Sequence, residues 1–196
     1  GDKMKRTKEL LTDTFWELLE EKAYSKITVN DIVSRCDVNR NTFYYHFQDI
    51  YELAEWVCIE DGKQALKDKK TYDTWQQGFL QIFQLVQENR AFVMNLYHSI
   101  SREQVERYLY RLTYQLLIGV VEEKSAGMSV RDEDKKFIAD FYKYAFVGLV
   151  LDWIRTGMKG EPQVLIDRLS VLIRGDVEKA LNHYRADQMK QSGPND

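Results

Sequence analysis

The stretch that decides the fold is ITVNDIVSRCDVNRNTFYYHF, residues 27–47, in which two short amphipathic segments flank a short break. Thr28 and Asp31 have the residue types and the spacing of a capping box, so a helix is predicted from about residue 29 to 36. Asn39 is a favourable N-cap residue, and a further helix of about two turns is predicted to follow it through His46.

The two sides of this last helix differ in chemistry. At about 100° per residue, Phe43 and Phe47 share one side, where they can pack against Ile32. The opposite side carries Asn41, Thr42, Tyr44 and Tyr45, with Arg40 at its edge. Side chains of these types can donate to phosphates and read base edges, and no acidic residue interrupts them. The pattern therefore predicts a helix-turn-helix whose second helix enters the major groove of DNA.

The rest of the chain also has helical periodicity. A first helix is predicted at about 4–22, and a fourth, beginning at Asp49, at about 49–70. Five more are predicted at about 72–88, 90–98, 101–126, 130–157 and 162–186. With only 2 Pro and 10 Gly in 196 residues, the fold class is all-α with about nine helices, because sandwiches and barrels need more turns. We expect a DNA-binding domain at 1–48 and a second domain at 49–196, with helix 49–70 as the connector.

The overall charge does not identify a partner. The formal net charge is -3, so a surface that binds nucleic acid has to be local. One basic cluster stands out at the start of the chain, formed by Lys3, Lys5, Arg6 and Lys8. It is expected to be a flexible arm that either contacts phosphates or is simply solvated.

Residues for catalysis are scarce. Cys36 and Cys58 form no C-x-x-C or Cys/His ligand spacing, so both are predicted to be reduced and structural. Three scattered His and the lack of a Gly-rich phosphate loop argue against an enzyme, and we expect no catalytic residues, no metal and no cofactor. The longest apolar run, residues 145–151, is too short to cross a bilayer, and no signal region is seen. We therefore expect a soluble cytoplasmic protein without a membrane partner.

The segment 137–153 is apolar on nearly all sides. A helix of this kind must be covered on most of its circumference, which favours a homodimer through helices at about 130–157 and 162–186. The alternative is one large monomeric core. Lys143 and Asp152 lie in this segment and need partners, which could be residues across the dimer, solvent or a ligand.

Aromatic residues are frequent in the second domain. At helical spacing most of them are expected in the core, but buried Tyr hydroxyls need hydrogen-bond partners and are compatible with a ligand pocket between helices. The candidate lining residues are Tyr97, His98, Tyr114 and Tyr142.

Residues 4–53, and above all ITVNDIVSRCDVNRNTFYYHFQDIYEL (residues 27–53), resemble the N-terminal DNA-binding domain of the TetR family of bacterial transcriptional regulators. The resemblance implies that Thr28 and Asn30 meet the DNA backbone or an adjacent base. It implies that the groove is faced by Asn39, Arg40, Asn41 and Thr42. Phosphates would be held, or the recognition helix supported, by Tyr44, Tyr45 and His46. Many members have a Lys where this chain has Ile50, so no side-chain phosphate contact is expected there.

The segment FYKYAFVGLVLDWIRTGMKGEP, residues 141–162, resembles a TetR subgroup that includes regulators of dihydroxyacetone kinase operons. Together the residues and the resemblance predict a homodimeric transcriptional regulator that binds a pseudo-palindromic operator in double-stranded DNA and is switched by a small-molecule or protein effector in the C-terminal bundle. The alternative is a helical adaptor that uses the same exposed face for protein contact. Salt separates the two, because DNA binding weakens steeply as salt rises.

Overall fold

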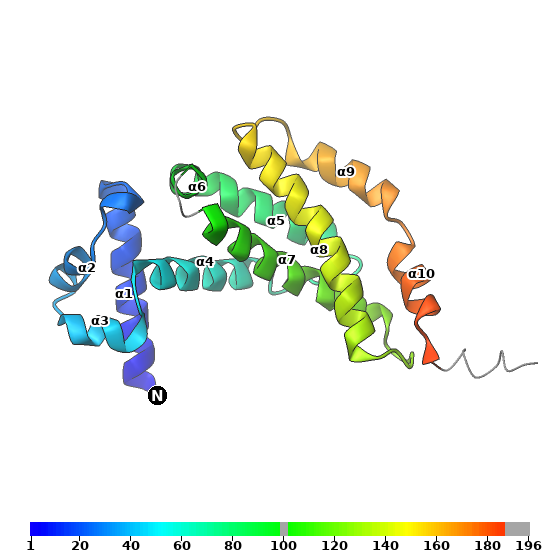
Figure 1. The fold of residues 1–196 in the computed structure, drawn as a ribbon, viewed down its shortest axis with the longest axis horizontal. Coiled ribbons are helices and arrows are strands. Elements are labelled where there is room, and N and C mark those ends of the chain that lie inside the picture. Colours follow the sequence, from blue (N-terminus) through cyan, green and yellow to red (C-terminus); the bar gives the residue numbers. More distant parts are fainter. Residues whose placement is uncertain (99–101, 187–196) are drawn as a thin grey trace, which may run out of the picture. The chain divides into compact units, whose positions relative to one another are not determined.

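The computed structural model describes residues 1–98 and 102–186, and within them the chain forms ten α-helices, one 3-10 helix and no strand (Figure 1). The predicted all-α class is confirmed. The chain divides into two compact units. The head unit comprises residues 1–61 and 89–108, and the body unit comprises residues 62–88 and those from 109 onward. No helix in the described ranges is both long and apolar enough to span a membrane.

The head unit begins with four helical elements around one core. They are α1 (Asp2–Glu21), the 3-10 helix η1 (Tyr24–Lys26), α2 (Val29–Arg35) and α3 (Arg40–His46). Helix α2 packs on both α1 and α3. The core side chains are fully or almost fully buried, and they are Leu11, Phe15, Leu18, Ile32, Val33, Phe43 and Phe47. The predicted apolar sides of these helices therefore face one another, as the periodicity requires.

The head unit also contains segments that are distant in sequence. These are the first part of α4 (Ile50–Leu66), all of α6 (Arg90–Tyr97) and the start of α7 (Arg102–Lys124). The buried ring of Phe92 in α6 lies 5.1 Å from the ring of Tyr24 and 6.3 Å from that of Phe15, both in edge-to-face geometry. Such aromatic pairs are favourable beyond their burial, so α6 completes the core of the head.

The body unit is built from α5 (Trp75–Glu88), most of α7, α8 (Asp132–Arg155), α9 (Pro162–Leu172) and α10 (Asp176–His183). Phe79 of α5 lies 4.7 Å from Phe146 of α8, and Phe83 lies 5.0 Å from Trp153 between ring centroids. Helix α9 packs on α5, and α10 packs on α8. These four aromatic side chains of α5 and α8 thus belong to the core of the body unit.

The C-terminal helix differs from the prediction. A single helix at 162–186 was expected, but the structure has α9 and α10 with a break between them. Gly175 lies in the break with φ of +79°, a left-handed conformation that glycine adopts without steric cost. This break turns the chain between the two helices, and the described residues therefore form ten α-helices instead of about nine.

One side of α8 is largely exposed in the described part of the chain. Phe137, Phe141 and Tyr144 are 59%, 62% and 59% exposed, while Phe146 and Val150 on the other side are fully buried. Helix α9 also carries exposed apolar side chains, which are Val164, Val171 and Leu172. We call this set the apolar stripe. In a monomer these large side chains lie in water.

Lys143 and Asp152, the two charged residues of α8 for which the sequence left the partners open, have partners within the helix. Lys143 Nζ lies 3.0 Å from Asp140 Oδ1 and 4.8 Å from the centroid of the Tyr144 ring. Asp152 Oδ1 lies 2.7 Å from Arg155 Nη2. Neither charge is buried without compensation, so neither by itself requires a ligand.

Candidate nucleic-acid interface

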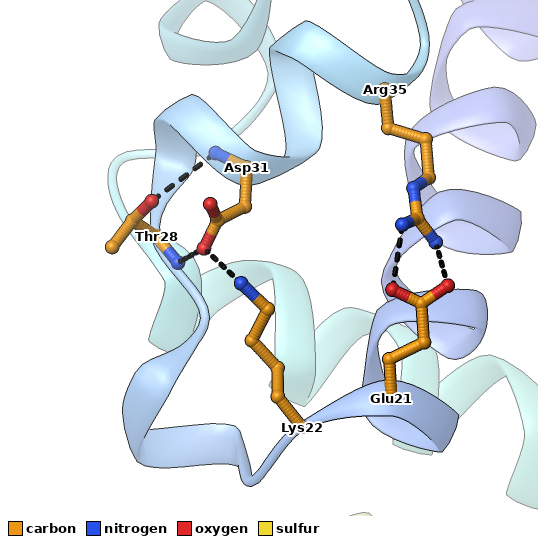
Figure 2. A network of polar contacts seen from close by, with 5 residues as sticks. All are labelled: Glu21, Lys22, Thr28, Asp31 and Arg35. Atoms are coloured by element: carbon orange, nitrogen blue, oxygen red, sulfur yellow. Dashed lines mark hydrogen bonds and ion pairs between the residues drawn. The ribbon is translucent and has the colours of Figure 1, made fainter.

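The start of α2 is held by a reciprocal capping box. The Asp31 N–H donates to Thr28 Oγ1 at 3.1 Å, and the Thr28 N–H donates to Asp31 Oδ2 at 2.9 Å (Figure 2). Lys22 Nζ lies 3.1 Å from the same carboxylate. The bond from the Thr28 N–H, and then the Lys22 ammonium, lower the pKa of Asp31. The predicted capping box is confirmed, and Thr28 is exposed at the first turn of the helix.

A second polar contact fastens α2 to α1. The Arg35 guanidinium donates two hydrogen bonds of 2.6 Å to the two carboxylate oxygens of Glu21 (Figure 2). This bidentate bond lowers the pKa of Glu21. The charge of Arg35 is therefore paired with Glu21 within the head unit.

The N-terminus of α3 is capped by Asn39. Its Oδ1 accepts the Thr42 N–H at 2.9 Å and the Thr42 hydroxyl at 3.1 Å. Phe43 and Phe47 are buried below, which sets the rotation of the helix about its axis. Asn39 and Thr42 thus bind each other, while Asn41 is exposed beside them.

Arg40 links the two helices of the motif. It donates through Nη1 to Asn30 Oδ1 at the start of α2, and through Nη2 to the Tyr44 hydroxyl at 3.0 Å. All three side chains are exposed. A guanidinium has five N–H donors, so N–H groups of Arg40 remain for a base or a phosphate after these two bonds. The structure brings together three of the predicted DNA-binding residues in one network.

The end of α3 presents Tyr45 and His46. Tyr45 is 71% exposed, and its ring meets that of His46 at 5.1 Å and 90°. His46 is half-buried. Burial, and secondly the positive charge of Lys8, lower the pKa of His46, so the imidazole is mainly neutral near pH 7.

The basic cluster at the start of the chain is not a flexible arm. Residues 2–21 form one helix, and Arg6 pairs with Asp2 at 3.3 Å one turn away. Lys8 Nζ lies 4.0 Å from the Trp56 ring centroid, a cation–π contact. These residues are helical for a local reason, because an acidic residue in the first turn and an i, i+4 ion pair both stabilise the helix.

The four predicted pocket residues do not form one site. Tyr97 is buried in the head at the end of α6 under the guanidinium of Arg102, and His98 next to it is exposed. Tyr114 and Tyr142 belong to the body unit, and both are half-buried. Of the four, only Tyr142 lines a cavity of about 240 Å³ in the body unit.

Side chains that sequence reasoning missed line the rest of this cavity, and they include Tyr72, Asp73, Gln76, Ser170, Arg174 and Glu178. They come from the loop before α5, from α5 itself, and from the end of α9 through α10. No spacing in the sequence relates these segments. Within the described ranges, the structure contains no group of three or more His, Cys, Asp or Glu side chains that could hold a metal ion.

Comparisons with known proteins agree with this geometry. Residues 11–57 match the family model described as bacterial regulatory proteins, tetR family. Residues 73–175, more than half of the chain, match the model of a transcriptional regulator C-terminal region. The HTH-type dhaKLM operon transcriptional activator DhaS of Lactococcus lactis subsp. lactis is 26% identical over 153 residues, which are 77% of this chain and 81% of DhaS.

Solved structures share the fold. The dihydroxyacetone kinase operon activator DhaS superposes with a TM-score of 0.60 at 22% identity, over 92% of this chain and 98% of its own. The TetR family repressor AlkX from Dietzia sp. strain DQ12-45-1b superposes with a TM-score of 0.55 at 13% identity, over 89% of this chain and 96% of its own.

Proposed function

Because the chain belongs to the TetR family of bacterial transcriptional regulators, we propose that it is a homodimer that binds a pseudo-palindromic operator through α3 and is switched by an effector in its body unit. The observation that carries the proposal is the Asn30, Arg40 and Tyr44 network, which orients a guanidinium on the exposed side of the motif. An Arg held in this way suits bidentate recognition of guanine in the major groove.

The other exposed groups have separate roles in this proposal. Asn41 and the free Nδ2 of Asn39 lie near Arg40 on the same short helix and would contact bases or phosphates. The hydroxyls of Tyr44 and Tyr45 would donate hydrogen bonds to phosphate oxygens, and His46 would support these residues from its half-buried position. Thr28 stands at the first turn of α2, where a hydroxyl and backbone N–H groups can meet the DNA backbone.

The apolar stripe supports the dimer. Large exposed apolar side chains on two neighbouring helices are typical of an interface between subunits. Two-fold symmetry would then place two recognition helices on successive turns of the major groove, about 34 Å apart. As a DNA-binding regulator of a bacterial family, the protein would act in the cytoplasm.

The effector has a thermodynamic requirement. A ligand shifts the protein between DNA-binding and non-binding states only if it binds one of them more tightly. The body unit, which carries the 240 Å³ cavity, is the candidate location for this ligand.

The experiment that tests the DNA-binding function is fluorescence anisotropy with the full chain. The probe is a DNA fragment from immediately upstream of its own gene, compared with random DNA of equal length at two salt concentrations. The proposal expects tighter binding to the upstream fragment and steep weakening as salt rises, by counterion release. If a genome-wide pool of fragments yields no DNA bound above the level of random sequence, the same face would instead be that of a protein adaptor.

A further inference from the structure

The loop between α4 and α5 lies directly against α5 and α7 of the body unit, and a glycine at each contact permits the close approach. A Cβ added to Gly78 of α5 would lie 2.6 Å from the Lys69 carbonyl oxygen, and one added to Gly119 of α7 would lie 2.5 Å from that of Lys70. Both separations are far below contact distance, so the loop backbone rests directly on the two helices. The N–H of Tyr72 donates to Glu123 Oε2 at 2.6 Å and fixes the loop further. The loop is therefore a preformed wall.

This wall closes one side of the 240 Å³ cavity, to which it contributes Tyr72 and Asp73. The interior is apolar and aromatic, with Trp75, Val120 and Phe146 among its lining residues. The volume equals about eight water-sized groups, so the cavity suits a small metabolite more than a drug-sized molecule.

The cavity is lined by both acidic and basic side chains. Asp73 and Glu178 contribute two carboxylates against the one guanidinium of Arg174, which is exposed. Beside the cavity, Lys124 Nζ lies 3.6 Å from the Tyr72 ring centroid and 3.2 Å from Glu178 Oε1. An aromatic face and a carboxylate thus already hold one ammonium group here, as they do in sites that recognise amines.

Glu178 has a further capacity for a donor. Its Oε2 atom is buried and has no hydrogen-bond partner in the described part of the chain. A buried carboxylate oxygen without a donor is unfavourable, and an N–H group from a ligand would remove this cost. The Tyr142 hydroxyl and the Gln76 and Ser170 side chains, which bond each other at 3.2 Å, offer neutral polar partners nearby.

We propose that this cavity binds a small amphipathic amine, with its ammonium donating to Glu178 beside the Tyr72 ring and its apolar part against Trp75 and Phe146. We further propose that this amine is the effector. The regulatory part rests on the proposed function of the chain, whereas the binding itself does not.

The test is calorimetric titration of the full chain with three probes of similar size. Phenethylamine carries the ammonium, 2-phenylethanol is its neutral analogue, and phenylacetate is its anionic analogue. We expect saturable binding of phenethylamine and about ten-fold or weaker affinity for the other two, because only the amine satisfies the Glu178 carboxylate. Equal affinities, a preference for phenylacetate, or no saturable binding of phenethylamine would overturn the proposal.

Two variants should change the affinity for phenethylamine in opposite directions. Glu178→Gln keeps the shape of the side chain but removes its charge, and it should weaken the binding of phenethylamine by about ten-fold. Lys124→Met removes the ammonium of the chain that competes for Glu178, and it should tighten the binding of phenethylamine. Glu133→Gln, at the exposed start of α8, is the control and should change nothing. Thermal melts of each variant check folding. Unchanged affinity in both Glu178→Gln and Lys124→Met would refute the assigned site.

Operator binding is measured separately, first without amine and then with phenethylamine at saturation. A chain that binds its operator but no amine refutes only the cavity proposal, and one that binds the amine but no DNA refutes only the regulator. If both bind and the operator affinity stays the same, the cavity is a binding site without the regulatory role.

Discussion

The Arg40 guanidinium lies 3.0 Å from the Tyr44 hydroxyl, one helical turn further along α3, and donates a hydrogen bond to it. Arg40 donates a second hydrogen bond to Asn30, which belongs to α2, the other helix of the motif. Both bonds restrict the rotamers of Arg40, so in the proposed complex with DNA part of the cost of ordering this side chain would already be met before binding.

Replacing Arg40 with Ala should cost about 1–3 kcal/mol of operator binding, concentrated at one base pair, because a bidentate contact with guanine is lost. Anisotropy with operators mutated at single positions measures this. Arg40→Lys is the matched control, since it keeps the charge but not the forked geometry and should retain affinity for random DNA. An equal loss on operator and random DNA would contradict a role in base reading.

The pKa of His46 should respond to Lys8. Burial is the larger cause of the lowered pKa and the Lys8 charge the smaller, so Lys8→Gln should raise the pKa of His46 without restoring its ordinary value of about 6.5. NMR titration of the imidazole protons measures it. Lys5→Gln is the control, and an unchanged His46 pKa in Lys8→Gln would show that the charge has no influence there.

The same shift sets the sign of a stability change. The folded-state pKa of His46 is below its unfolded value, so its contribution to stability is complete above about pH 6.5 and is lost as the pH falls through the folded pKa. Urea unfolding of the full chain and of His46→Gln, compared over this window, should show a smaller fall in the variant.

Phe141→Glu should disrupt the proposed dimer. The side chain is 62% exposed in the monomer, and on the apolar stripe a carboxylate would have to be buried without a partner in the dimer. We expect the dimer dissociation constant to rise by about 100-fold, equivalent to about 3 kcal/mol, in sedimentation velocity over a range of concentrations. Lys136→Glu, exposed elsewhere on α8, should leave the dimer intact. A dimer that survives both Phe141→Glu and Leu172→Glu would use another surface.

Gly119→Ala should destabilise the body unit by about 1–3 kcal/mol, although Ala favours helices, because its Cβ would meet the Lys70 carbonyl oxygen. Denaturant unfolding followed by circular dichroism measures the loss. Gln115→Ala, exposed on the same helix, should remain within about 0.5 kcal/mol of the parent. Equal stability of the two variants would mean that the loop moves away at little cost.

The sequence by itself determined the elements whose signals are local. The Thr28 and Asp31 capping box, the Asn39 cap and the periodic burial of Phe43 and Phe47 depend on residues within four positions of one another. Because such interactions act within one or two turns, they specify the helix-turn-helix and its exposed side without any tertiary contact. Gly175 shows that local signals do not locate every helix end, because its left-handed backbone interrupts a segment whose apolar periodicity predicts one continuous helix.

The tertiary structure alone decided which distant segments meet. Phe92 packs against Phe15 and Tyr24 in the head, and Tyr72 reaches the Lys124 and Glu178 pair in the body. Such contacts depend on how whole helices pack, and no periodicity within one helix encodes the partner that its apolar side will find. For the same reason, the sequence could suggest Tyr142 as a pocket residue but not the cavity, whose walls come from segments about a hundred residues apart.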